Sequence, residues 1–222
     1  MYKLYHYYLC PSSRFVRLVL EENKIEYETQ LENYWTPQKD FLHINPAGHL
    51  PVLINNDNYY LIGSNVCMEY FNSSWSKVNL MNKDYKEQAE IRRVFHWFDT
   101  LFKKEVLDPI IYEKVYSRIV ENIIPNSHNI RSGLQNLSFH INYFDYLLKE
   151  RSWIAGENLS FSDLLAAANL SVLDYLGLLE FGKYQNIKEW YLKVKSRPSF
   201  KTLLKDQIVG LNPDNNYNNL DF

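Results

Sequence analysis

The sequence predicts an α+β N-terminal domain followed by an all-α C-terminal domain, and three observations support this. The first third alternates β-prone with helical segments, the remainder shows helical periodicity alone, and a polar stretch without periodicity separates the two. With 222 residues, the chain is long enough for two small domains. Hydrophobic residues make up 46% and charged residues 23%, a balance typical of globular proteins.

The N-terminal domain is predicted to begin with a strand and a helix. Residues 3–7 (KLYHY) are rich in aromatic side chains, which favour strands. Pro11 indicates the first position of a helix, with Cys10 as the residue that caps it. A short strand is expected near residues 27–30. Four side chains at spacings of three and four form the apolar face of the helix: Phe15, Val16, Val19 and Leu20.

The second half of this domain is predicted to contain a weak helix, a hairpin and a longer helix. The weak helix spans residues 39–44, and the hairpin strands span residues 51–54 and 59–62. Ser64 is expected to cap a helix that runs to Trp75. Its predicted buried side consists of Val66, Cys67, Tyr70 and Phe71. The order strand–helix–strand–helix–strand–strand–helix is that of a thioredoxin-like domain.

The C-terminal domain is predicted to be wholly helical. The expected boundaries are residues 1–76 for the first domain, 77–84 for a linker and 85–222 for the second domain. Apolar stripes at helical spacing cover residues 91–102, 110–124 and 130–148. Ser160 and Asp163 form a capping-box pattern before a further apolar helix, so Asp163 is expected to be structural. Two shorter helices end near residues 197 and 205, and a polar tail occupies residues 207–222.

Charge and cysteine content exclude several classes of function. A net charge of −2 provides no basic surface for nucleic acid. Cys10 and Cys67 are far apart, and the histidines are scattered, so no metal site is expected. No secretory signal and no apolar stretch of about 18 residues are present. The sequence therefore predicts a cytoplasmic protein without a membrane span.

Three motifs resemble those of the glutathione transferases. CPSSRFVRLVL resembles their first strand–helix junction, NPAGHLPVL their loop with a cis-proline, and WIAGENLSFSDLLAAA the buried helix of their C-terminal domain. Four further segments, YEKVYSRI, SVLDYLG, WYLKVKSRPSF and the terminal NLDF, resemble the FzlA-type bacterial division proteins of this superfamily. That resemblance implies a homodimer that binds filaments of the tubulin homologue FtsZ, is recruited to the division site and requires no cofactor.

Cys10 is the candidate catalytic residue that the transferase resemblance implies. It stands where transferases place the residue that faces the glutathione sulfur. A helix N-terminus lowers the pKa of a thiol from about 8.5 to roughly 3.5–7.5. A reactive Cys10 would make the protein a glutathione-dependent transferase or thiol transferase, the alternative function. Cys10 could equally be a semi-buried cap without chemistry.

The same resemblance implies a glutathione site at Leu50, Pro51 and Ser64. A cis bond would join Leu50 to Pro51, and Ser64 would hold the γ-glutamyl carboxylate. Both features also have purely structural explanations, as a tight turn and as a helix cap. Gly63 stands where transferases usually have Glu, Asp or Gln, which removes a charge-assisted hydrogen bond worth about 1.5–3 kcal/mol. Glutathione is therefore expected as a possible substrate or weak ligand.

Two segments are candidates for partner binding. Trp35 is expected at the rim of the cleft, and aromatic side chains are enriched at interface hot spots. Leu220, Asp221 and Phe222 end the chain with two apolar anchors and a carboxylate. The alternatives are packing of Trp35 against the second helix and a frayed terminus.

Overall fold

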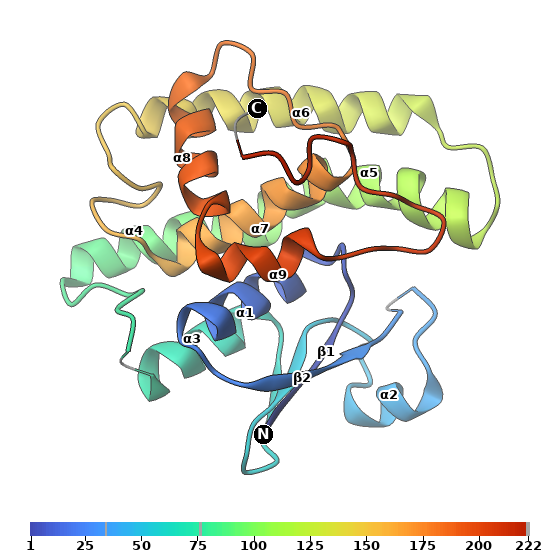
Figure 1. Cartoon of the computed structure of the whole chain (residues 1–222), viewed down its shortest axis with the longest axis horizontal. Helices are drawn as coiled ribbons and strands as arrows, with labels where there is room; N and C mark the ends of the chain where they lie inside the picture. The colour runs from blue at the N-terminus through green and yellow to red at the C-terminus, as the bar shows by residue number, and fades with distance from the viewer. Residues whose placement is uncertain (34, 76, 221–222) are drawn as a thin grey trace.

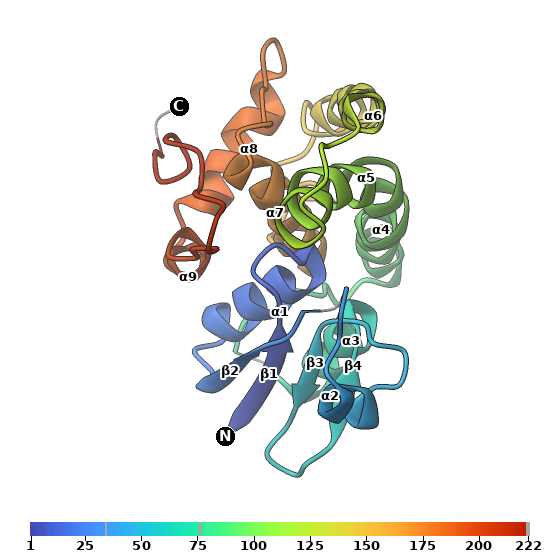
Figure 2. The ribbon, with the colours of Figure 1, turned by 90° about the vertical axis from the view of Figure 1, so that its right-hand side faces the viewer.

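The computed structural model describes residues 1–33, 35–75 and 77–220. A four-stranded sheet lies at the base of the molecule, and the helical domain lies above it (Figure 1, Figure 2). The strands are β1 (Tyr2–His6), β2 (Tyr27–Leu31), β3 (Val52–Ile54) and β4 (Tyr60–Ile62), in the order β2-β1-β3-β4. β1 is parallel to β2 and antiparallel to β3, and β3 is antiparallel to β4. This is the predicted thioredoxin-like arrangement.

Successive side chains of β1 point to opposite faces of the sheet, and each face packs against different helices. Leu4 joins the main core with α1 (Pro11–Glu22) and α3 (Ser64–Ser74). Tyr5 points to the other face, where its ring lies 5.5 Å from that of Phe41 in α2 (Lys39–Ile44). The sheet is therefore covered by helices on both sides.

The C-terminal domain is all-helical, as predicted. One continuous helical rod runs from residue 85 to residue 120 and includes two segments of π-helical geometry. In chain order the elements are α4 (Tyr85–His96), η1 (Trp97–Leu107), α5 (Asp108–Ile111), η2 (Tyr112–Val120), α6 (Ser127–Leu147), α7 (Phe161–Tyr175), α8 (Gln185–Lys195), η3 (Pro198–Phe200) and α9 (Lys201–Leu204). The residues of α7 are all buried, and this helix packs against α1, α4, η1 and α8.

The predicted capping box at the start of α7 is present, and Asp163 is structural. Its carboxylate accepts hydrogen bonds from the backbone N–H of Ser160 and Ile154, each at 2.9 Å, and from Trp190 Nε1 at 2.8 Å. Burial raises the pKa of Asp163, while these donors favour its charged form. Asp163 thus ties three segments of the domain together.

Three expectations about helix boundaries and faces were wrong. Gly63, at φ 90°, is the N-cap of α3, and Ser64 is its first residue. Val66 is 48% exposed, because the buried face of α3 passes through residues 64, 67, 68 and 71. The rod ends at Val120, and Ile124, expected to continue the apolar stripe, is 91% exposed. Pro125 follows immediately and disfavours helical backbone in the residue before it.

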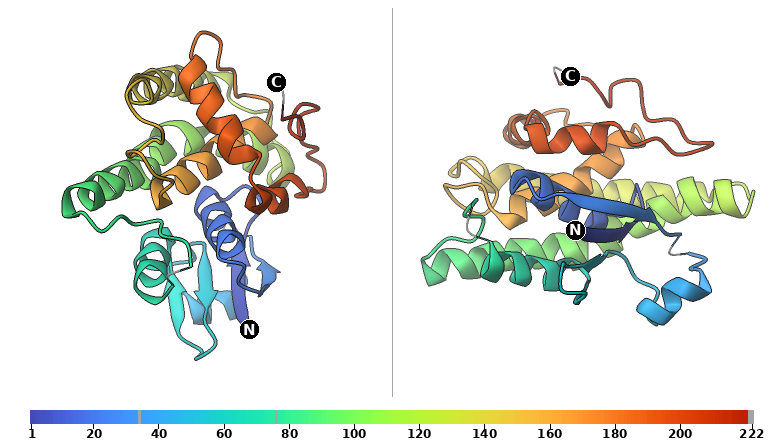
Figure 3. Two further views of the ribbon diagram at one scale, coloured as in Figure 1. Left: turned by 60° about the vertical axis from the view of Figure 1, so that its left-hand side comes forward. Right: turned by 60° about the horizontal axis from the view of Figure 1, so that its bottom comes forward.

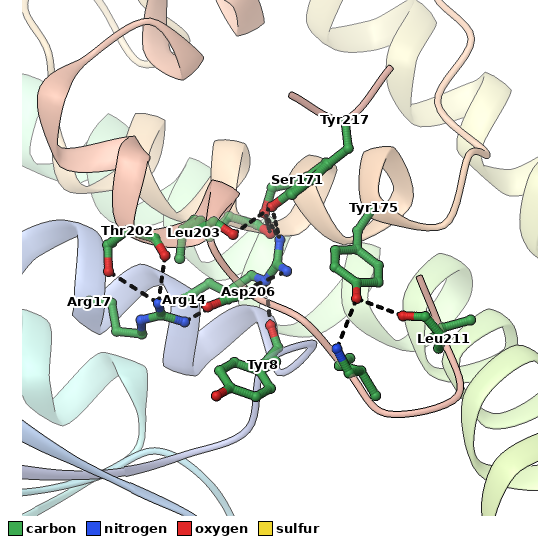
Figure 4. Close-up of polar contacts among 12 residues, drawn as sticks. Tyr8, Arg14, Arg17, Ser171, Tyr175, Thr202, Leu203, Asp206, Leu211 and Tyr217 are labelled. Carbon is green, nitrogen blue, oxygen red and sulfur yellow. Dashed lines mark hydrogen bonds and ion pairs between the residues drawn. The ribbon is translucent and has the colours of Figure 1, made fainter. Parts of the chain in front are cut away.

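Two arginines of α1 join the N-terminal domain to the C-terminal domain (Figure 4). Arg17 donates from both terminal nitrogens to the carboxylate of Asp206, each at 2.8 Å. Arg14 Nη1 donates to Ser171 Oγ at 2.7 Å, and its Nη2 lies 3.7 Å from Asp206. Arg14, Arg17 and Asp206 are all at most 5% exposed. The two domains therefore meet through a buried, hydrogen-bonded ion cluster.

The C-terminal segment, expected to be a polar loop, is anchored to the body of the protein. Tyr217 is fully buried; its hydroxyl accepts from Arg14 at 3.1 Å and donates to the carbonyl of Leu203 at 3.1 Å. Tyr175 holds an earlier part of the segment by donating to the carbonyl of Leu211 at 2.7 Å. Figure 3 shows this segment and α9 beside α1, so the end of the chain supports the domain junction.

We predict that Asp206→Asn lowers the free energy of unfolding by about 3–5 kcal/mol, because it leaves two buried guanidinium groups without a counter-charge. Urea denaturation measures the change. The control is Arg92→Ala, which breaks an ion pair with Glu69 whose side chains are 40% and 45% exposed, and should cost at most about 1 kcal/mol. Equal effects of the two substitutions would contradict a stabilising role for the buried cluster.

A second prediction concerns His6, which is 2% exposed at the end of β1. Burial, followed by the charges of Arg17 and Arg14, lowers its pKa from 6.5 to about 3. The unfolded chain therefore binds a proton that the folded chain excludes. The free energy of unfolding is therefore unaffected by the titration of His6 above pH 6.5. It decreases as the pH falls from 6.5 toward 3, by up to about 1.4 kcal/mol per pH unit. Urea denaturation across this range should show a shallower pH dependence for His6→Gln, and no change for the exposed His128→Gln.

Candidate functional site

The structure brings together the residues that the sequence suggested for a glutathione site. Cys10 is the N-cap of α1, and its Sγ lies 3.9 Å from the carbonyl oxygen of Leu50. The Leu50–Pro51 bond is cis, as predicted. Pro51 is in turn linked to the start of α3, because its carbonyl accepts from the N–H of Gly63 at 2.9 Å. Three loops therefore converge at one edge of the sheet.

These residues are closed off from solvent. Cys10 is 5% exposed, Leu50 is 9% exposed and Ser64 is 4% exposed. Cys10 and Leu50 form a small hydrophobic cluster with Phe41 and Val52. The sulfur is thus packed among apolar side chains, and the use of these residues in binding glutathione stays a prediction.

An activated Cys10 thiol would need a lowered pKa, and the surroundings of Cys10 act in the opposite direction. Burial raises its pKa, and the opposing hydrogen bonds from Ser13 and Ser12 at the start of α1 are the smaller effect. Desolvation disfavours the charged thiolate more than the helix N-terminus favours it. The thiol form therefore dominates at neutral pH.

Ser64, the residue expected to hold the γ-glutamyl carboxylate, donates instead to a carboxylate of the C-terminal domain. Ser64 Oγ donates to Asp99 Oδ1, and Ser12 Oγ donates to the same oxygen at 3.4 Å. Asp99 belongs to η1, so it reaches from the helical rod to the beginnings of α1 and α3. Negative charge is favourable at helix N-termini, and Asp99 supplies it internally. The sequence carried no signal for this contact, because Asp99 lies beside the apolar stripe of its helix rather than in a motif.

Gly63 has a backbone conformation that suits glycine. Its φ of 90° is rarely adopted by residues with a side chain, although an added Cβ would meet no atom within 4 Å. The acidic or amide residue that transferases place here would therefore be strained in this backbone. The presence of glycine at position 63 is consistent with this conformation.

Trp35 lies between the two domains rather than free on a rim. Its ring centroid is 5.2 Å from that of Tyr7 and 5.3 Å from that of Tyr116 in η2. The side chain is half-buried.

Of the terminal candidates, Leu220 is 42% exposed, whereas Asp221 and Phe222 lie outside the described residues, as does position 76 at the predicted domain boundary. The structure does not bring Trp35 and Leu220 into contact with each other.

The described residues contain no group of three or more His, Cys, Asp or Glu side chains that could hold a metal ion. Within the same residues, no helix is both long enough and apolar enough to cross a membrane.

We predict that Cys10 in the folded protein reacts with iodoacetamide at least about tenfold more slowly than free N-acetylcysteine at neutral pH. Its buried thiol is mostly protonated, so the rate should rise as the pH increases. Peptide mapping by mass spectrometry after timed labelling separates Cys10 from Cys67. Fast labelling at Cys10 that does not change between about pH 6 and pH 8 would indicate a lowered pKa instead.

We also predict that Asp99→Asn increases the affinity for glutathione by at least about tenfold, because it removes a like charge from the position of the γ-glutamyl carboxylate. Isothermal titration calorimetry of the wild type and the variant measures this ratio. Glu150→Gln, at an exposed carboxylate after the end of α6, is the control. Unchanged affinity in Asp99→Asn would show that Asp99 does not occupy the ligand position.

Comparisons with known proteins agree with this geometry. The family model described as glutathione S-transferase, N-terminal domain matches residues 9–74, and the corresponding C-terminal domain model matches residues 133–207. FtsZ-localized protein A of Caulobacter vibrioides is 36% identical over 99% of this chain and 97% of that protein.

Solved structures give the same result. FzlA from C. crescentus has a TM-score of 0.97 at 36% identity, covering 100% of this chain and 99% of that one. A glutathione S-transferase from Rhodospirillum rubrum has a TM-score of 0.95 at 37% identity, with both chains fully covered. The chain therefore belongs to the glutathione S-transferase family and is similar over its full length to FtsZ-localized protein A.

Proposed function

We propose that this protein is a cell-division factor that binds FtsZ filaments as a homodimer, is recruited to the division site and requires no cofactor. The observation that carries the proposal is the similarity to FtsZ-localized protein A, at 36% identity over 99% of this chain. A TM-score of 0.97 to FzlA supports the same assignment.

The geometry of the Cys10 region supports a binding role over transferase chemistry. Glutathione-dependent catalysis through Cys10 requires an accessible thiolate, whereas this thiol is 5% exposed and has a raised pKa. Glutathione-dependent catalysis also requires that Ser64 be available to the carboxylate of the ligand, whereas Ser64 already donates to Asp99. Gly63 contributes no partner for the ligand's ammonium group.

Exposed apolar side chains on the N-terminal domain support a dimer. Tyr59 is 63% exposed, Tyr60 is 47% exposed and Val66 is 48% exposed. They lie along the edge strand β4 and the helix α3 that follows it. Exposed apolar groups at a sheet edge favour association with another chain. A two-fold dimer would present two identical docking surfaces and could bridge neighbouring filaments.

Co-sedimentation with polymerised FtsZ tests the proposal. The wild-type protein is expected in the pellet only when FtsZ is polymerised, and Cys10→Ser should bind equally well because the thiol has no role in docking. A folded wild-type protein that stays in the supernatant at all filament concentrations would refute filament binding.

The tail is tested by ending the chain after Asn219. This truncation removes Leu220, Asp221 and Phe222 but keeps the buried Tyr217, which contacts Arg14, and the carbonyl of Asn219, which accepts from Lys195 at 3.0 Å. We expect at least about a tenfold weaker affinity for filaments with little change in melting temperature. The exposed Asn215→Ala in the same segment is the control. Full binding by the truncated chain would exclude the tail from the docking surface.

A further inference from the structure

A groove of about 460 Å³ crosses the outer face of the C-terminal domain, between α6 and the loop that leads into α8. Figure 2 shows α6 at the end of the molecule opposite the sheet. The residues that line the groove include four aromatic side chains and two lysines: Phe139, Tyr143, Tyr146, Tyr184, Lys149 and Lys183. None of these residues belongs to the Cys10 site described above.

Two of the four aromatic side chains of the groove are left largely uncovered by the fold. Phe139 and Tyr146 are each 65% exposed. They lie seven residues apart, so both occupy one face of α6, whereas the buried stripe of this helix passes through Leu137, Ile141 and Phe144. Large aromatic groups that contribute little to the core and line a groove are typical of binding surfaces.

The groove also carries positive charge that the protein does not neutralise. Lys183 Nζ lies 5.4 Å from the ring centroid of Tyr184, and Lys149 Nζ lies 5.9 Å from that of Tyr146. Within residues 1–33, 35–75 and 77–220, neither lysine forms an ion pair. The two ammonium groups are therefore available to an external anion.

The carboxylate that lines the groove is already engaged. Asp145 is 8% exposed, and its two oxygens accept from the N–H of Ile187 and from Asn186 Nδ2, each at 3.1 Å. This contact holds the first turn of α8 and satisfies the negative charge at a helix N-terminus. Both oxygens of Asp145 are thus taken up by donors of α8, and within the described residues Asp145 forms no ion pair with Lys149 or Lys183.

We propose that this groove binds a short acidic peptide segment of a partner protein, with one apolar side chain between carboxylates. The aromatic floor accepts the apolar side chain, and Lys149 and Lys183 pair with the carboxylates. A second copy of the same groove is a poor occupant, because its lysines would repel those of the first. This docking surface follows from the groove's side chains and holds whether or not the partner is an FtsZ filament.

Fluorescence anisotropy with two labelled peptides tests the proposal on the full-length protein. The probe is Glu-Asp-Phe-Leu-Asp-Glu, and the matched peptide is Gln-Asn-Phe-Leu-Asn-Gln. We expect the acidic peptide to bind at least about tenfold more tightly, with the difference shrinking between about 50 and 300 mM salt. Equal binding of the two peptides, or no binding of either, would overturn the proposal.

Substitutions locate the binding surface. The double variant Lys149→Glu with Lys183→Glu should lose at least about tenfold in affinity for the acidic peptide, and Phe139→Ser should weaken both peptides. Lys39→Glu, an exposed charge reversal on α2, is the control and should change neither. A loss as large in Lys39→Glu, or conversion of a dimer to a monomer by Phe139→Ser, would contradict a peptide groove at this site.

Discussion

The contact between two arginines of α1 and Asp206 decides how the halves of this protein sit against each other. Charges removed from water are costly, and here the cost is offset by paired hydrogen bonds from Arg17 at 2.8 Å and by the approach of Arg14. Because Arg14 also contacts Ser171 and Tyr217, the same cluster orients α7 and the end of the chain. Loss of Asp206 would leave both buried guanidinium groups without the carboxylate that they share.

This orientation also determines the state of the Cys10 region. Cys10 caps the helix that carries the two arginines, and Asp99 approaches that helix from the other domain. The helix N-terminus favours a thiolate, but desolvation of the buried sulfur outweighs this effect. The fold thus retains the cis-proline turn and helix N-termini of a transferase site, while the polar side chains there hydrogen-bond to other residues of the same chain.

The surfaces proposed to contact other proteins lie on the outside of the molecule. The edge strand β4, the exposed end of the chain and the groove along α6 all present apolar side chains that the core does not use. They lie on different parts of the molecule. Because the buried arginines and Asp206 fix the orientation of the two domains, the distance between these surfaces is expected to stay constant.

The resemblance to glutathione transferases implied the cis bond before Pro51. The sequence by itself determined the thioredoxin-like order of elements, the helical C-terminal domain and the capping box at Ser160 and Asp163. Each of these depends on residues close together in the chain, where periodicity, capping and proline geometry act. Only the tertiary structure decided the burial of Cys10, the contact of Asp99 with Ser64, the anchoring of Tyr217 and the exposure of Val66. These features join residues 35 to 203 positions apart, or depend on what covers a helix face, and no local pattern encodes such contacts.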